Sequence, residues 1–255
     1  LVNDGVRELL LVAQDSSDYG RDLTPRSSLA KLCTELGELP CWLRVHYVYP
    51  GPQADALVRL MAEGLVLPYL DVPLQHASPA VLKRMRRPGS AEDMLTRIAR
   101  WRAICPELTI RSTFITGFPG ETEDDFRQLL DFLTSAQLDR VGCFAYSDVP
   151  GAPAQAFADA VPAELREERA MELMDLQEQI SYAKLKARVG TRCLVLIDAL
   201  EEGRALARSA AEAPDVDGVI VIENPGQVEP GDLVEVEITA NDAHDLTARP
   251  CLRQL

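Results

Sequence analysis

Short apolar runs that each end in polar or aromatic side chains are the feature that most limits how this chain can fold. Five such runs lie at residues 8–13, 42–45, 69–74, 110–115 and 141–144, and a helix-like segment follows most of them. This repeat is typical of a β/α fold, in which parallel strands point their carboxyl ends toward one edge of a sheet. The polar residues after the runs therefore share one predicted location, which favours an enzyme.

The length and composition allow one large domain followed by a small one. The chain has 255 residues, and 47% of them are hydrophobic, which suffices for a sizeable core. No apolar run approaches the ~18 residues of a membrane span, and no signal peptide opens the chain. The opening lacks an initiator Met and resembles the last turn of a helix with Gly5 as its C-cap. We expect the sequence to be part of a longer protein.

The charge and the cysteines exclude some classes of protein. A formal net charge of −14 argues against general nucleic-acid binding, because phosphate backbones repel an acidic chain. The basic run at 83–87 is a local exception. The six cysteines form no C-x-x-C or C-x-x-x-C pair, so we expect reduced thiols with structural or incidental roles.

The period of the hydrophobic pattern changes near residue 190, and we predict a domain boundary there. Before the boundary, helices are expected to begin at Thr24-Pro25, at residue 54, after Ser90, after Thr122 and at Pro162. After it, alternating segments at 193–198, 204–208, 218–222 and 233–239 predict a small antiparallel β-barrel. The two expected domains are therefore residues 1–189, ending in a long helix, and residues 190–255.

Two strand ends carry the strings most suggestive of a binding site. Residues 115–122 (ITGFPGET) lie between a strand and a helix, where glycines and free amides let a ligand approach the backbone. An ordinary turn with a good N-cap explains them equally well. Gln75, His76 and Ser78 follow another strand, and His46 has a matching position on the preceding one. A His–His metal site is an alternative there, although it lacks a clear third ligand.

Further candidates follow the first and fifth runs. Gln14 and Asp15 combine an amide and a carboxylate at a strand end, although Asp also forms turns by itself. Phe144 and Tyr146 could form an aromatic wall for a planar ligand, or pack in the core. The absence of a Walker loop, a nucleophile elbow and a dinucleotide-binding glycine motif disfavours NTPases, esterases and NAD-dependent enzymes.

Several strings in order resemble the methylthiotransferase branch of the radical S-adenosylmethionine (radical SAM) enzymes. They are QDSSDYGRDL, VPLQHASPAVLKRMRRPG, TFITGFPGETEDDF and FAYSDVPGAPA, followed by a TRAM-like barrel. The resemblance implies an α/β fold: a partial, TIM-like (β/α) radical SAM barrel and then a small antiparallel TRAM barrel. It also implies addition of a methylthio group to an aspartate of a small-subunit ribosomal protein. The tRNA-modifying relatives usually have QN in place of Gln14-Asp15 and QSGS at 75–78.

The charge of the C-terminal part independently favours a protein substrate. Residues 186–255 contain 13 acidic and 7 basic side chains. An acidic barrel would attract a basic ribosomal protein and would repel tRNA. A tRNA methylthiotransferase, a cluster-free adaptor for ribosomal protein and a metal-dependent hydrolase that uses His46 and His76 are the alternatives.

The resemblance also implies cofactors. In the family, a [4Fe–4S] cluster held by C-x-x-x-C-x-x-C cleaves S-adenosylmethionine to a 5′-deoxyadenosyl radical, and a second cluster takes part in sulfur delivery. This chain contains no such motif. The cluster cysteines are therefore expected upstream of Leu1, and the chain alone is expected to be inactive. An electron-donor protein, a cytoplasmic location and no membrane partner are further expectations.

The resemblance assigns the remaining cofactor cradle by position. The expected cofactor-binding residues are Gln14, Asp15, Gln75, His76, Arg111, Thr113, Thr116, Gly117, Phe144 and Tyr146. Arg111 is the candidate for the methionyl carboxylate, because a guanidinium binds a carboxylate through two parallel hydrogen bonds. A surface salt bridge is the alternative for Arg111, because its alternation with Ser112 leaves open which face it lies on.

Overall fold

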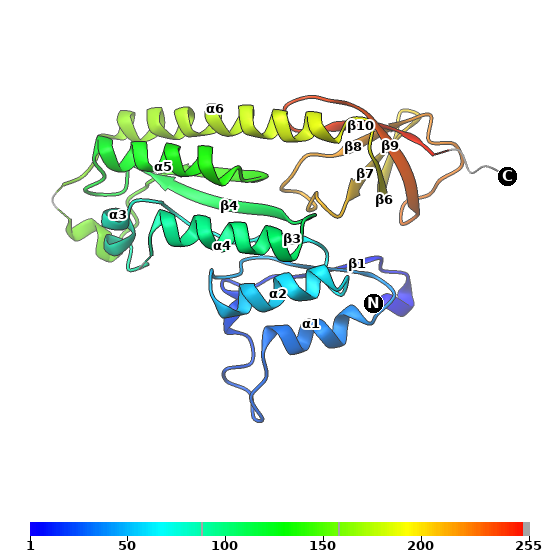
Figure 1. The fold of residues 1–255 in the computed structure, drawn as a ribbon, viewed down its shortest axis with the longest axis horizontal. Helices are drawn as coiled ribbons and strands as arrows, with labels where there is room; N and C mark the ends of the chain where they lie inside the picture. The colour runs from blue at the N-terminus through cyan, green and yellow to red at the C-terminus, as the bar shows by residue number, and fades with distance from the viewer. Residues whose placement is uncertain (88, 158, 252–255) are drawn as a thin grey trace.

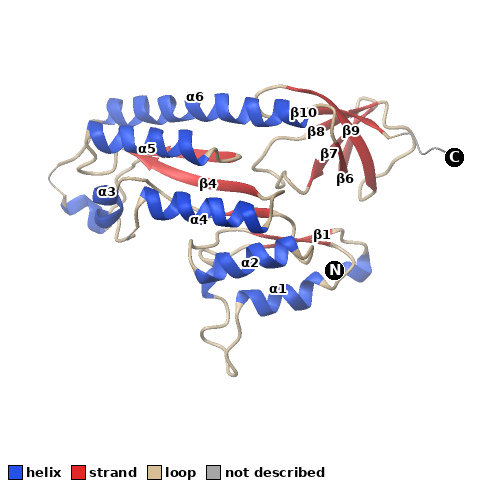
Figure 2. Ribbon diagram, viewed as in Figure 1, coloured by secondary structure: helices blue, strands red, loops and turns tan. Residues whose placement is uncertain are grey.

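The computed structural model describes residues 1–87, 89–157 and 159–251, which form a helix-covered parallel sheet and then a closed β-barrel (Figures 1 and 2). The first part contains β1 (Glu8–Leu11), α1 (Leu29–Gly37), β2 (Trp42–Val45), α2 (Pro52–Ala62), β3 (Tyr69–Asp71), α3 (Pro79–Arg84), α4 (Ala91–Ile104), β4 (Thr109–Thr116), α5 (Glu123–Ala136), β5 (Arg140–Ala145) and α6 (Ala163–Arg188). The second part contains β6 (Arg192–Glu201), β7 (Arg204–Ser209), β8 (Ile220–Glu223), β9 (Leu233–Asn241) and β10 (Leu246–Pro250). Short 3-10 turns lie at η1 (Val2–Asp4), η2 (Ser16–Asp18) and η3 (Pro153–Ala156).

The first sheet is parallel throughout, in the order β1-β2-β3-β4-β5. This confirms the β/α pattern predicted from the apolar runs. One face packs on the helices through residues such as Leu43, Leu70 and Phe114. The opposite face carries the alternate residues, among them Tyr69 and Arg111. That second face is the inner surface of a partial barrel.

Comparison of the predicted and observed helix starts shows which N-terminal sequence signals determine where a helix begins. Thr122 caps α5 in a full capping box, because its side chain accepts from Asp125 N while the Asp125 carboxylate accepts from Thr122 N. The expected helix start at Thr24-Pro25 is wrong. Helix α1 begins at Leu29, where the Ser28 hydroxyl accepts from the Lys31 amide at 3.2 Å. A serine that can cap N–H groups sets this helix start, and Pro25 lies in the preceding loop.

The C-terminal strands close into a barrel in the order β10-β8-β7-β6-β9. The pairs β6·β7, β7·β8, β6·β9 and β9·β10 are antiparallel, whereas β8 and β10 pair in parallel. The barrel is therefore closed as predicted but not purely antiparallel. Its core consists of alternate apolar residues such as Val195, Ala207 and Ile238.

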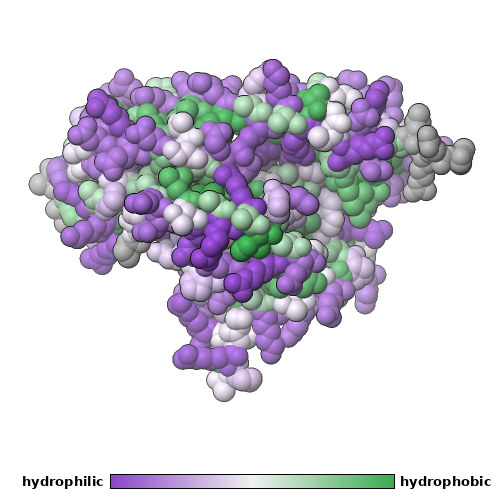
Figure 3. All heavy atoms as spheres, in the orientation of Figure 1, coloured by the Kyte–Doolittle hydropathy of each residue, from purple (hydrophilic) through white to green (hydrophobic). Residues whose placement is uncertain are grey.

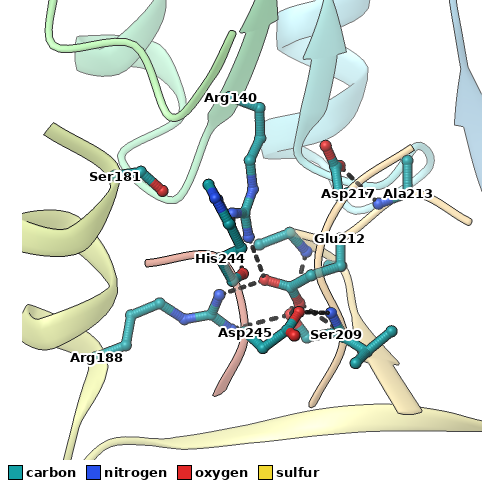
Figure 4. A network of polar contacts seen from close by, with 12 residues as sticks. Arg140, Ser181, Arg188, Ser209, Glu212, Ala213, Asp217, His244 and Asp245 are labelled. Atoms are coloured by element: carbon teal, nitrogen blue, oxygen red, sulfur yellow. Dashed lines mark hydrogen bonds and ion pairs between the residues drawn. The ribbon is translucent and has the colours of Figure 1, made fainter. Parts of the chain in front are cut away.

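Helix α6 joins the two parts, and the barrel lies at the amino ends of the parallel strands (Figure 1). Arg208 of β7 pairs with Glu8 of β1 at 2.7 Å, and Glu8 also pairs with the buried Arg44 of β2. Figure 4 shows that Arg140 of β5 and Arg188 of α6 converge on one carboxylate, Glu212 in the β7–β8 loop. The barrel is thus attached to the end of the sheet opposite the strand carboxyl ends.

The surface is mainly hydrophilic on the face drawn in Figure 3, with hydrophobic side chains in smaller patches. In the described ranges, we find no helix that combines the length and apolar character required to span a bilayer.

Candidate active site at the strand carboxyl ends

A cavity of about 460 Å³ opens at the carboxyl ends of β3 and β4, and we call it the mouth cavity. It is lined by Gln75, Arg84, Met85, Arg86, Arg87, Ile115, Phe118, Ala152, Pro153, Ala154 and Phe157. Three arginines of the basic run therefore face one cavity together with apolar and aromatic walls. This combination suits a ligand that has both a flat apolar part and a negative charge.

Gln75 is held at the mouth by its backbone. Its amide N donates to Thr113 O and its carbonyl accepts from Ile115 N, both at 2.9 Å, so the residue extends the sheet beyond β3. Its φ of 71° is left-handed, a conformation that non-glycine residues seldom adopt. Backbone strain of this kind is found where a side chain must be aimed at a particular place.

Behind the mouth, Glu121 is a buried hub that fixes the glycine-rich turn. Its carboxylate accepts from His76 Nε2 at 3.2 Å, from Gly117 N at 2.9 Å and from Arg169 of α6 at 2.8 Å. His76 Nδ1 accepts from the Ser78 amide at 2.9 Å, so the ring proton lies on Nε2. Both nitrogens of His76 are therefore engaged inside the protein, and the residue positions Gln75 and Gly117.

The turn that follows β4 allows close packing against Arg166 of α6. Gly117 has a φ of 70°, and a Cβ added there would overlap the side chain of Arg166. Arg166 in turn donates to Tyr146 O at 2.9 Å, and its guanidinium lies 5.2 Å from the centre of the Tyr146 ring. Thr116 is buried, and its hydroxyl donates to Arg166 O at 3.2 Å. Thr116, Gly117 and Tyr146 therefore meet around one side chain of α6.

The inner face of the sheet carries a second polar group, centred on Asp71. The Asp71 carboxylate accepts from His46 Nδ1, from Tyr47 N and from Arg111, each at 3.1 Å. Burial would raise the pKa of Asp71, but the hydrogen bond from His46 and the charge of Arg111 outweigh it, so the pKa is lowered. An ionised Asp71 orients the imidazole of His46, whose Nε2 is buried without a partner in the described part of the chain.

Arg111 is already engaged with the protein. It pairs with Asp71, and its Nε lies 3.9 Å from Asp217 of the β7–β8 loop. To bind a ligand carboxylate, Arg111 would have to share or leave these partners. Thr113 lies next along the same face of β4, and Phe144 on β5 is paired with Ile115 and 65% exposed. This face is therefore open toward the mouth.

The residues after β1 lie at the far edge of the sheet. Gln14 is exposed. The Asp15 carboxylate accepts from Ser17 N at 2.9 Å and caps η2. Ser16 joins this loop to the next strand, because its hydroxyl donates to His46 O at 2.6 Å. Of the predicted cofactor residues, Gln75 lines the mouth cavity, and Gln14 and Asp15 lie at a separate edge.

The cysteines do not form a cluster site. All six are free thiols, and Cys33, whose pKa burial raises to about 12, lies in the core. Within residues 1–87, 89–157 and 159–251, no group of three or more His, Cys, Asp and Glu side chains could hold a metal ion. His46 and His76 bind separate carboxylates, which disfavours the His–His hydrolase. A [4Fe–4S] cluster therefore does not fit the residues of this chain.

Two important residues were not singled out from the sequence. Arg169 belongs to a highly charged helix, yet it is 4% exposed and bound to Glu121. Asp71 stands in an apolar run and draws attention only once Arg111 is placed beside it on the neighbouring strand. A charged residue within an otherwise apolar strand was the available signal for Asp71.

Comparison with known proteins agrees with this geometry. The profile of the radical SAM superfamily matches residues 1–133, and that of the TRAM domain matches residues 189–251. Coproporphyrinogen III oxidase (HemN) from Escherichia coli, a radical SAM enzyme, has a similar fold with a TM-score of 0.51 and 15% identity over 71% of this chain and 49% of that one. At this identity the likeness concerns the fold alone.

Curated relatives are much closer in sequence. Ribosomal protein uS12 methylthiotransferase RimO from Azoarcus sp. is 56% identical over 97% of this chain and 58% of that protein. The RimO proteins of Aromatoleum aromaticum and Klebsiella pneumoniae are 54% and 53% identical over 98% and 96% of the chain, which spans 59% and 58% of their lengths. The chain thus spans less than two thirds of these relatives. It belongs to the radical SAM superfamily and, within that superfamily, to the RimO family.

Proposed function

We propose that this chain is part of a methylthiotransferase that adds a methylthio group to an aspartate of ribosomal protein uS12. The observation that carries the proposal is the mouth at the strand carboxyl ends, where Gln75 and the Glu121-bound turn adjoin a cavity of about 460 Å³. Sequence identity of 53–56% to RimO proteins over nearly the whole chain supports the same function.

S-adenosylmethionine fits the mouth by its chemistry. The cavity offers the apolar wall of Ile115 and Phe118 for a flat base and arginines for a carboxylate. Cofactor bound in the mouth would be held by Gln75 and the arginines of the basic run, and together with a [4Fe–4S] cluster from outside this chain it would supply radical chemistry. In this proposal Gln75 hydrogen-bonds the cofactor, and His76 positions Gln75.

The other predicted residues have supporting roles in the proposal. Thr116 and Gly117 form the floor under the adenosine, and Phe144 and Tyr146 flank it. Arg111 and Thr113 lie along the inner face, where Arg111 either binds the methionyl carboxylate or orders Asp71 and His46. Gln14 and Asp15 follow the edge strand β1 and would close that side of the cofactor site. Replacing Arg111 with alanine should weaken cofactor binding, and an unchanged affinity would remove Arg111 from the cradle.

The cluster ligands are proposed to come from outside this chain. The six cysteines show neither the spacing nor the grouping for a cluster, and the RimO relatives are longer than the chain. We therefore assign the C-x-x-x-C-x-x-C loop and a second cluster to a segment upstream of Leu1. An electron-donor protein would supply the reducing electron, and the cytoplasm is the proposed location.

The TRAM barrel is proposed to bind the basic protein substrate. Two arginines at its junction with the sheet domain are used within the protein, since Arg188 of α6 pairs with Glu212, and Arg208 of β7 with Glu8 and Asp198. Residues 190–255 contain 13 acidic and 5 basic side chains, so the barrel keeps a clear acidic excess. Such a surface favours uS12 over the tRNA used by MiaB-type relatives.

The test is an anaerobic assay of the full-length protein. The protein is reconstituted with iron and sulfide, then incubated with S-adenosylmethionine, a reductant and either purified uS12 or tRNA. We expect mass spectrometry to find the methylthio group on one aspartate of uS12 and none on tRNA. Modification of tRNA, or cofactor cleavage that leaves uS12 unchanged, would contradict the proposal.

A further inference from the structure

A second cavity, of about 330 Å³, lies at the opposite end of the sheet, and we call it the distal cavity. It is lined by Arg111, Asp139, Arg140, Val141, Gly142, Met174, Gln177, Glu178, Ser181, Val216, Asp217, Gly218 and His244. These residues come from β4, the α5–β5 loop, β5, α6 and two loops of the TRAM barrel. The cavity thus exists only because the two domains pack together.

The two arginines that line the distal cavity already have partners within the protein. Arg140 binds Glu212 at 3.1 Å and also reaches the His244 carbonyl (Figure 4). Arg111 binds Asp71 at 3.1 Å and faces Asp217. Both guanidinium groups are therefore paired with carboxylates of the protein, and an anion would have to share or displace these partners.

Three hydrogen-bond acceptors on α6 that line the distal cavity, in contrast, have free capacity. Gln177 is 3% exposed; its Nε2 donates to Leu138 O at 3.1 Å, and its Oε1 is buried without a partner in the ranges that the structure describes. One turn of α6 further on, the Ser181 hydroxyl donates its proton to Ala243 O and keeps its lone pairs. Glu178 is exposed and forms no ion pair with any described residue. A ligand that matches these groups must be a hydrogen-bond donor with positive charge.

The cavity also has unfilled space on its sheet wall. Apart from its chain neighbours, no described residue has an atom within 4 Å of a Cβ added at Gly142 of β5. Gly142 pairs with Thr113 and so lies on the inner face of the sheet. From Gly142 to Tyr146 the chain advances four residues, or roughly 13 Å at ~3.3 Å per residue. A partner anchored in the distal cavity could therefore extend along the inner face to the mouth.

We propose that the distal cavity binds one cationic side chain, a lysine or arginine, of the uS12 substrate. This inference rests on the proposed function and names a second contact point for its protein substrate. The anchor would hold uS12 against both domains at once, with the target aspartate at the mouth. Charge supports it, because a chain with a net charge of −14 offers here a carboxylate and an unpaired amide oxygen.

The test measures binding of fluorescein-labelled, purified uS12 to this chain and to the full-length protein by fluorescence anisotropy. Glu178→Gln should weaken binding about fivefold to tenfold, because it removes the charge that faces the cation. Glu172→Gln is the matched control: it lies on the same helix, is exposed, makes the same change of charge and lies outside the cavity. It should change the affinity less than twofold.

A second variant tests the space itself. Gly142→Leu should fill the cavity and weaken binding at least tenfold, while an unchanged melting curve by circular dichroism shows that the fold is retained. Acetylation of the uS12 lysines distinguishes the two sources of the cation. Loss of the Glu178→Gln effect after acetylation indicates a lysine, and its persistence indicates an arginine.

Some outcomes would overturn the inference while the proposed function stands. They are equal weakening by the Glu178 and Glu172 variants, full affinity of Gly142→Leu, or binding of uS12 by the full-length protein that both cavity variants leave unchanged. If the full-length protein neither binds nor modifies uS12, the proposed function itself fails.

Discussion

The Tyr69 hydroxyl donates a hydrogen bond of 2.6 Å to the Asp217 carboxylate, and this bond joins the third strand of the sheet to the TRAM barrel. Asp217 also accepts from Ala213 N at 2.9 Å, which fixes the β7–β8 loop. Burial and the neighbouring Asp217 charge raise the pKa of Tyr69, so the phenol remains a donor at any physiological pH. The inner face of the sheet and the barrel are therefore parts of one polar network.

Tyr69→Phe should loosen that junction without disturbing the sheet core. Because the bond joins a buried hydroxyl to a carboxylate, its loss should lower the free energy of unfolding by about 1.5–3 kcal/mol. Urea denaturation of the two proteins measures the difference. Tyr182→Phe, which alters an exposed phenol on α6, is the control and should have an effect of less than ~0.5 kcal/mol.

Gly117→Ala should destabilise the protein more than Gly203→Ala, although both glycines have a positive φ. Gly117 and Gly203 have φ values of 70° and 81°, but only Gly117 has a side chain, Arg166, where the Cβ would be. Gly203→Ala should cost about 1 kcal/mol for its φ, whereas Gly117→Ala should cost at least ~1 kcal/mol more through overpacking. Thermal melts of both variants compare them; equal losses would show that Arg166 moves aside freely.

Arg169→Met should reveal how strongly the Glu121 hub depends on its counter-charge. Removal of one partner from a buried ion pair leaves the other charge unpaired, with an expected cost of ~3–5 kcal/mol. The exposed Arg127, which pairs with Glu123 on α5, provides the comparison, and Arg127→Met should cost less than ~0.5 kcal/mol. Denaturant titrations at neutral pH measure both, and a small effect at Arg169 would argue against the hub.

Acid should weaken the contact between the two domains. Burial would raise the pKa of Glu212, but Arg188 and Arg140 lower it below the reference value of 4.5. A carboxyl group with a depressed pKa in the folded state stabilises the fold above its unfolded pKa and loses that contribution as the pH falls through its folded pKa. The stability difference between the wild type and Glu212→Gln should therefore shrink below about pH 4.5. A difference that stays constant down to pH 3 would contradict this assignment.

The local pattern predicted β1 to β5 from apolar runs and β6 to β9 from alternating segments. It predicted α4 and α5 because Ser90 and Thr122 accept from Asp93 N and Asp125 N. These signals act over three or four residues. The pattern did not predict β10, whose pairing with β8 and β9 depends on residues that are distant in sequence. The predicted start of α1 was wrong because Pro25 and Ser28 are both typical of a helix start, and the structure uses Ser28.

The sequence predicted where the site lies, but it did not predict which hydrogen bonds and ion pairs join its residues. Residues such as Gln75 and Gly117 stand at strand ends, which the alternation of strands and helices already indicates. The partners of Glu121 come from three separate segments, at His76, Gly117 and Arg169, and no local pattern links them. Long-range pairing of buried charges is set by tertiary packing, so only the structure reveals it.

The most direct test of the account is the affinity of the reconstituted full-length protein for S-adenosylmethionine, measured by anaerobic equilibrium dialysis. Gln75→Asn tolerates a positive φ but shortens the side chain at the mouth, and it should weaken cofactor binding about fivefold, the value of one hydrogen bond. Tyr69→Phe, at the barrel end of the same sheet, should leave the affinity unchanged. Full affinity in Gln75→Asn together with weakened binding in Tyr69→Phe would place the cofactor at the other end of the sheet and contradict the account.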